Sequence, residues 1–198
     1  LSYELDEVVV KGPSLNVVFA EAAGYALADH VGIDVPPWGV CGIREEEGLV
    51  FCCKKLRGRY PIDHWIRDGL LANRENIGKT IAFDVWVANH DRNIGNFVED
   101  ATSAREDGHE HGTKVFAIDF EKAAILRGEP DRFTLAGWPS SKFWPVEALG
   151  DLCEGEEQPH DFIDQLSGIG GDKVLGLLEE VRMAVDLAAI DWLQSAAG

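Results

Sequence analysis

The feature that most constrains this chain is the polar stretch at residues 88–97, which reads ANHDRNIGNF. An apolar run with helical spacing leads directly into it. Asp91 and Asn96 lie five positions apart on this stretch, and a second apolar run later in the chain ends in another carboxylate, Asp119. The pattern predicts a polar loop that is supported by a buried helix and faces a short strand ending in Asp119.

These residue types suit phosphoryl transfer. Moving a phosphoryl group from ATP needs metal ions and positioned charge rather than covalent help from the protein. Carboxylate and amide oxygens are hard donors of the kind that Mg²⁺ prefers. We expect Asp91 to orient or deprotonate an acceptor hydroxyl, and Asn96 and Asp119 to bind Mg²⁺.

Lys11 and Glu21 are the candidates in the N-terminal part. Lys11 ends the run EVVVK at residues 7–11, whose β-branched side chains predict a buried strand. From there it can reach ATP phosphates, or it can extend its ammonium into water. Glu21 lies on a helix predicted for residues 14–30. It pairs with Lys11 if it faces the strand; otherwise it is a carboxylate favoured by the helix dipole, and the sequence leaves both open.

The remaining elements predict the α+β class. We expect a small antiparallel sheet with one helix, followed by a mainly helical part, with all of residues 1–198 in one domain. The expected sheet lobe is 1–56, and the expected helical lobe, which carries the polar loop, is 57–198. The expected elements are strands at 39–43, 49–53, 96–98 and 114–118, a charged hairpin loop at 44–48, and helices at 63–71, 76–89, 161–166 and 172–194.

The composition of the chain limits the classes of partner that we expect it to bind. The chain has 35 acidic and 18 basic residues, a net charge of -17, which disfavours nucleic acid and anionic membranes. Its one basic cluster, residues 54–60, is either a solvated connector or a surface for phosphates or an acidic substrate. The HEH sequence at 109–111 predicts an exposed loop rather than a metal site.

Cysteine usage and hydropathy favour the cytoplasm. The four Cys lack zinc-site spacing, which predicts reduced, buried thiols. No apolar segment reaches the roughly 18 residues needed to span a bilayer, and no signal peptide is visible.

Several of these segments together resemble compact bacterial HipA-like kinases, which belong to the protein-kinase-like and phosphatidylinositol-kinase-like superfamily. The resemblance lies in the helix with Glu21 and in the segments VVVK (8–11), GIDVPP (32–37), FDVWVANHDRNIGN (83–96) and FAIDF (116–120). It implies a two-lobed fold that uses ATP and Mg²⁺. The implied nucleotide-site residues are Lys11, Glu21, Asp91, Asn96 and Asp119, of which the last three are catalytic.

The chain departs from the usual pattern of that family at three places, one of which is His90, directly before the expected catalytic Asp91. Ten residues precede Lys11, so we expect the phosphate-covering hairpin to be missing or reduced unless the native chain starts upstream. Glu121 stands where a Gly often follows Asp-Phe. The acceptor is a protein Ser/Thr or a small molecule. The alternatives are a nucleotide-binding module without turnover and, ranked last, a Mg²⁺-dependent phosphatase, which lacks the Asp-x-Asp nucleophile pattern.

Overall fold

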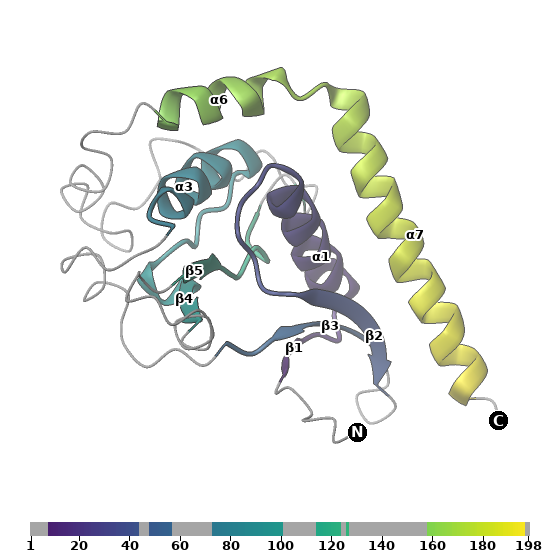
Figure 1. Ribbon diagram of the computed structural model, residues 1–198. Coiled ribbons are helices and arrows are strands. Elements are labelled where there is room, and N and C mark those ends of the chain that lie inside the picture. The colour runs from purple at the N-terminus through teal and green to yellow at the C-terminus, as the bar shows by residue number, and fades with distance from the viewer. Residues whose placement is uncertain are drawn as a thin grey trace, which may run out of the picture.

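The computed structural model describes residues 8–43, 48–56, 73–100, 114–123, 126 and 158–196. These residues form a three-stranded antiparallel sheet, a two-stranded ladder and four α-helices (Figure 1). The predicted α+β class with a small antiparallel sheet is therefore confirmed.

The sheet has the strand order β1-β3-β2. β1 (Val8–Lys11) and β2 (Trp38–Ile43) both pair antiparallel with the central strand β3 (Gly48–Lys54). The register places Lys11 opposite Phe51, whose side chain is completely buried. The strands predicted around residues 7–11, 39–43 and 49–53 are thus confirmed to within one or two residues at each end.

The expectation that β1 is buried is wrong. Val8, Val9 and Val10 are 56%, 40% and 45% exposed. β1 is an edge of the described sheet, and successive side chains of a strand point to opposite faces, so no described element covers them all. A run of β-branched residues indicates a strand, whereas burial depends on what packs on it.

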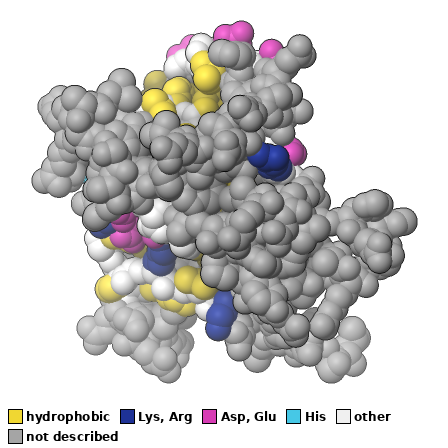
Figure 2. Space-filling view, turned by 90° about the vertical axis from the view of Figure 1, so that its left-hand side faces the viewer, with side chains coloured by type: hydrophobic (Ala, Val, Ile, Leu, Met, Phe, Trp, Pro, Cys, Tyr) yellow, Lys and Arg dark blue, Asp and Glu magenta, His cyan; other side chains and the backbone are white. Residues whose placement is uncertain are grey.

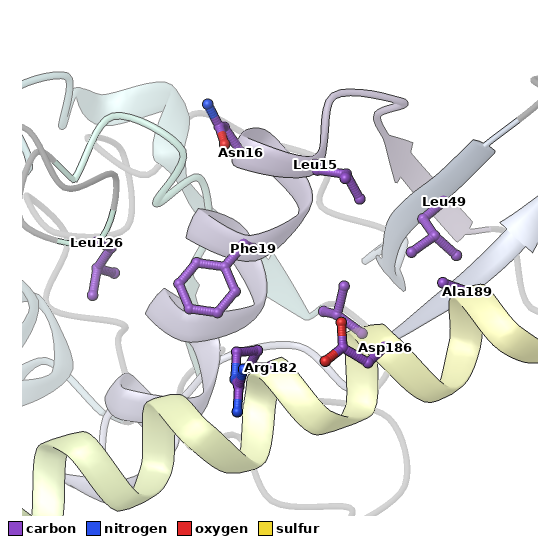
Figure 3. A pocket seen from close by; sticks show the side chains of 9 residues that line it. Leu15, Asn16, Phe19, Leu49, Leu126, Arg182, Asp186 and Ala189 are labelled. Atoms are coloured by element: carbon purple, nitrogen blue, oxygen red, sulfur yellow. The ribbon is translucent and has the colours of Figure 1, made fainter.

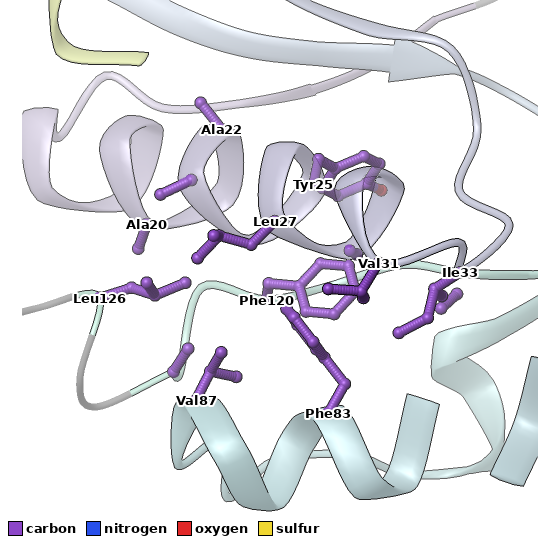
Figure 4. Packing of buried hydrophobic residues seen from close by; sticks show 14 of the residues in the cluster. Ala20, Ala22, Tyr25, Leu27, Val31, Ile33, Phe83, Val87, Phe120 and Leu126 are labelled. Carbon is purple, nitrogen blue, oxygen red and sulfur yellow. The ribbon is translucent and has the colours of Figure 1, made fainter. Parts of the chain in front are cut away.

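Helix α1 (Leu15–His30) lies against the sheet and supplies seven of the buried hydrophobic core residues. Ser14 occupies the expected N-cap position without a side-chain hydrogen bond, and the chain turns away at Gly32 with φ 78°. Phe120 lies between α1 and α3 (Figure 4). Its ring meets those of Tyr25 and Phe83 edge-on, at centroid distances of 5.4 and 5.6 Å.

Helix α3 (Glu75–Val87) delivers the polar stretch. The helix ends at Ala88, which is left-handed with φ 56°, and the stretch closes with a 3-10 turn, η1 (Ile94–Asn96). β4 (Phe97–Asp100) then pairs antiparallel with β5 (Lys114–Ala117), as predicted. Besides apolar residues, the helix buries the polar residues Asn76, Thr80 and Asp84.

The last two helices are α6 (Gln158–Gly168) and α7 (Gly171–Ala196). α6 packs on α3, whereas α7 runs beside α1 and packs against β2 and β3 (Figure 1). Val181 and Val185 of α7 are buried. Ile190 is 48% exposed, because a residue nine positions from Val181 lies on the opposite side of the helix. Within the described helices, none is long and apolar enough to cross a membrane.

The expectation of buried thiols holds for one of the described cysteines. All three are free; Cys53 is buried, Cys52 is half-buried and Cys41 is exposed, because Cys41 lies on the edge strand β2. Several expectations fall outside the described residues. They concern the hairpin loop at 44–47, the basic residues 57–60, the helix at 63–71, the HEH loop at 109–111 and the lobe boundary after residue 56.

Candidate functional site

The site is built around the ammonium group of Lys11. Its Nζ lies 2.5 Å from Oε1 of Glu21 and 2.8 Å from Oδ1 of Asp119. Glu21 comes from α1, ten residues along the chain, and Asp119 follows β5, 108 residues along it. The ammonium of Lys11 is thus held by two carboxylates and does not extend freely into water. Glu21 likewise faces the strand.

Glu21 also fixes the backbone that follows Asp119. Its carboxylate accepts hydrogen bonds from the amide N–H groups of Phe120, at 3.2 Å, and Glu121, at 3.1 Å. The Glu21 side chain is completely buried, so these contacts and Lys11 replace the water it gives up. One helix residue thus holds both the Lys and the segment that carries Asp119.

Burial and the ion pairs act against each other at this group. Burial raises the pKa of Glu21 above its usual value, and Lys11 opposes that rise. Burial lowers the pKa of Lys11, but Glu21 and Asp119 raise it by more, so the ammonium stays charged. The charged state of Lys11 is what would attract the phosphates of a nucleotide.

Asp119 has a backbone conformation that non-glycine residues rarely adopt, with φ 67°. Such a conformation persists only where the surroundings hold it. Asn89 contributes by donating from Nδ2 to the Asp119 carbonyl at 3.4 Å, and Lys11 holds the carboxylate. The turn points this side chain at Lys11 rather than along the strand.

Asp91 and Asn96 form a second group that is joined to the first through the backbone. Asn96 donates from its amide nitrogen to the Asp91 carbonyl at 3.3 Å, and its own carbonyl accepts from the N–H of Ile118 at 3.0 Å. Ile118 immediately precedes Asp119. With its nitrogen committed to the loop, Asn96 has Oδ1 as the atom that can bind a cation.

The donor set fits a hard divalent cation. Carboxylate oxygens of Glu21, Asp119 and Glu121 lie within 4.8 Å of one another, and Nζ of Lys11 lies 4.0 Å from Glu121. The Lys11, Asp119 and Glu121 side chains are 24%, 29% and 27% exposed, so the group is open to solvent. Acidic and basic side chains lie next to each other on the face shown in Figure 2. Oxygen donors of this kind suit Mg²⁺ better than softer metals.

Two further residues of this region, Asp84 and Arg92, are not among the candidates that the sequence predicts. They form a buried ion pair beneath the loop, with Nε of Arg92 2.6 Å from Oδ2 of Asp84. The signal was a lone carboxylate inside the apolar helix, followed by an Arg directly after the expected catalytic Asp91. Charged residues are almost never fully buried unless they are paired, so each of the two predicts the other.

A cavity of about 440 Å³ lies elsewhere, between the start of α1 and α7 (Figure 3). None of the five candidate residues lines it. Its walls are Leu15, Asn16, Phe19, Leu49, Leu126, Arg182, Val185, Asp186 and Ala189. The candidate site and this cavity are therefore separate features.

Comparison of the chain with protein-family models, with curated proteins and with solved structures found no match.

Proposed function

We propose that this protein transfers the γ-phosphoryl group of ATP to a hydroxyl acceptor, in a two-lobed protein-kinase-like fold. The observation that carries the proposal is the contact of Lys11 with both Glu21 and Asp119. Nothing in strand or helix formation requires a charged group from β1, one from α1 and one after β5 to meet at a partly exposed position. Binding of a charged ligand there would explain the arrangement.

Each candidate residue would have one task in this reaction. Lys11 would bind phosphate oxygens, and Glu21 would hold Lys11 in place from below. Asn96 and Asp119 would hold Mg²⁺, which neutralises charge on the phosphates when it is bound. Asp91, half-buried on the loop, would accept the proton of the acceptor hydroxyl.

ATP binding tests the proposal first. Titration of ATP and Mg²⁺ together should raise the midpoint of thermal unfolding, because a ligand that binds only the folded state stabilises it. Asp119→Asn should reduce this shift, since a neutral amide binds Mg²⁺ more weakly than a carboxylate. If no nucleotide stabilises the wild-type protein, the proposal fails.

Turnover is the second test. Asp91→Ala should retain the ATP-dependent shift but lower phosphoryl transfer to an accepted hydroxyl by roughly two to four orders of magnitude, the usual contribution of a positioned general base. Undiminished transfer in this variant would show that Asp91 has no role in catalysis.

A nucleotide-binding module without turnover is the second candidate. The observation that favours it is the edge position of β1, because no described strand lies beyond Lys11 to cover bound phosphates. ATP-dependent stabilisation with no transfer to any acceptor, and none to water, would favour this candidate.

A further inference from the structure

Arg92 is the most extensively bonded side chain of the described site. Its guanidinium donates to the Asp84 carboxylate from two nitrogens, from Nε to Oδ2 at 2.6 Å and from Nη2 to Oδ1 at 3.0 Å. The two side chains are 3% and 0% exposed. A bidentate pair of this kind fixes the plane of the guanidinium as well as its position.

The third nitrogen of the Arg92 guanidinium, Nη1, contacts both the polar loop and the segment before Asp119. It donates to the carbonyl of Asn96 at 3.1 Å and to the carbonyl of Ile118. Asn96 is itself one expected cation ligand, and Ile118 directly precedes the other, Asp119. This nitrogen and the direct hydrogen bond from the N–H of Ile118 to the Asn96 carbonyl, at 3.0 Å, therefore together fix the separation of the two segments that carry the expected ligands.

Asn89 closes the same network from the other side. Its Nδ2 donates to Oδ1 of Asp84 at 2.9 Å and to the carbonyl of Asp119 at 3.4 Å. The guanidinium also lies over two rings, 4.8 Å from the centroid of Phe120 and 5.4 Å from that of Phe97. Since Asp119 is left-handed, contacts on both sides of it are needed to hold its direction.

We propose that Arg92, anchored by Asp84, is a positioning residue that sets the separation of Asn96 and Asp119 and thereby the affinity for a divalent cation with bound nucleotide. The inference rests on the function proposed above. It goes beyond stabilisation of the fold, because it ties a buried side chain to a binding constant at atoms that Arg92 does not touch.

The variant Arg92→Lys separates the charge balance of the buried pair from the positioning of Asn96 and Asp119. Lys can place a positive charge near Asp84, but its compact ammonium lacks the planar fork that reaches the carboxylate and two carbonyls at once. Arg92→Lys thus keeps the charge balance of the buried pair while it removes the side-chain link between the carbonyls of Asn96 and Ile118; the backbone hydrogen bond between these two residues stays.

The test measures the dissociation constant of Mn²⁺, a hard cation visible by electron paramagnetic resonance, in the presence of a non-hydrolysable ATP analogue. Loss of residues that orient metal ligands weakens metal binding about ten- to a hundredfold, and we expect this for Arg92→Lys. The matched control is Val185→Ala, a buried change on α7 that should destabilise the fold but leave the Mn²⁺ constant within roughly twofold, since distant sites act independently.

The outcomes are distinct. If wild-type protein and Arg92→Lys bind Mn²⁺ equally well with the analogue, the positioning role is wrong while the proposed function stands. If the wild type binds no Mn²⁺ with the analogue, the proposed function fails, and this inference fails with it.

A second variant covers the case in which Arg92→Lys does not fold. Asn89→Ala removes the link from Asp84 to the Asp119 carbonyl and the 3.4 Å hydrogen bond from the N–H of Asp91 to Oδ1 of Asn89, and it leaves the ion pair intact. We expect it to weaken Mn²⁺ binding in the same direction by a smaller factor. An unchanged constant in a folded Asn89→Ala protein would contradict the proposal.

Discussion

Lys11 and Glu21 show how one ion pair serves both stability and a charged site. Glu21 has given up all contact with water, so its negative charge is tolerated because Lys11 and two backbone N–H groups face it. Lys11 is also the group that would bind the phosphates of a nucleotide. Because Lys11 compensates the buried charge of Glu21, a variant without Lys11 should show how much free energy that burial costs.

Lys11→Met should destabilise the protein, and the loss should depend on pH. Without Lys11, burial raises the pKa of Glu21 further, so the folded protein binds a proton at Glu21 more tightly than the unfolded chain does. Stability then falls as the pH rises from the unfolded pKa of about 4.3 through the higher folded value. We expect a loss of about 1.5–3 kcal/mol in the free energy of unfolding at pH 7.5, and a smaller loss at pH 5.

Urea unfolding of the wild type and the variant at both pH values measures this difference. The control is Lys11→Met made in a Glu21→Gln background: relative to Glu21→Gln alone, the loss should no longer depend on pH, because Glu21 is absent from both proteins. A loss for Lys11→Met that is equal at both pH values, or larger at pH 5, would show that Glu21 is not the group responsible.

At the scale of elements, α1 packs unusually close to the segment after β5. A Cβ atom built on Gly24 would lie 2.3 Å from Cβ and 2.7 Å from Cγ of Phe120. Glycine is unfavourable within a helix, so its presence here is explained by this close approach rather than by helix propensity. The same approach brings Glu21, three residues earlier on α1, to the backbone N–H of Phe120.

Gly24→Ala should therefore destabilise the protein by about 1–3 kcal/mol, because overpacking outweighs the gain in helix propensity. It should also reduce ATP-dependent stabilisation, since Phe120 adjoins Asp119.

Gly176→Ala on α7 is the matched control. A Cβ there meets nothing within 4 Å, so the same substitution should stabilise by roughly 0.5–1 kcal/mol. Urea unfolding distinguishes the two signs, and a stabilised Gly24→Ala protein would contradict the packing argument.

The elements were largely predictable, whereas their surroundings were not. Periodicity and β-branched runs located α1, α3, β1 and β3, because these signals are local. Burial of β1 could not be predicted, since it depends on which residues lie beside an edge strand. The Lys11–Glu21 contact was one of two alternatives in the sequence, and the sheet register, which is a long-range property, decided it. Asp84 went unnoticed because its partner lies across a turn.

At the scale of the whole molecule, the two ends of the chain share one packed unit. α7 lies against β2, β3 and α1, although the sequence suggested that it belonged with the helical part (Figure 1). Its packed side includes the buried residues Val181 and Val185, while its opposite side carries exposed Leu175, Met183 and Leu187. The stability of the sheet that supplies Lys11 should therefore depend on residues about 170 positions away.

Val181→Ala tests this dependence. Removing two buried methyl groups should cost about 1–2 kcal/mol in the free energy of unfolding, and the loss should be shared by the sheet because α7 packs on it. Leu187→Ala removes more apolar surface, but Leu187 is 59% exposed, so that variant should be nearly neutral. Native-state hydrogen exchange measures which amides lose protection when the protein is destabilised. In Val181→Ala, the amides of β3 should exchange faster together with those of α7. If only the α7 amides accelerate, α7 unfolds independently of the sheet, and the two ends of the chain do not form one cooperative unit.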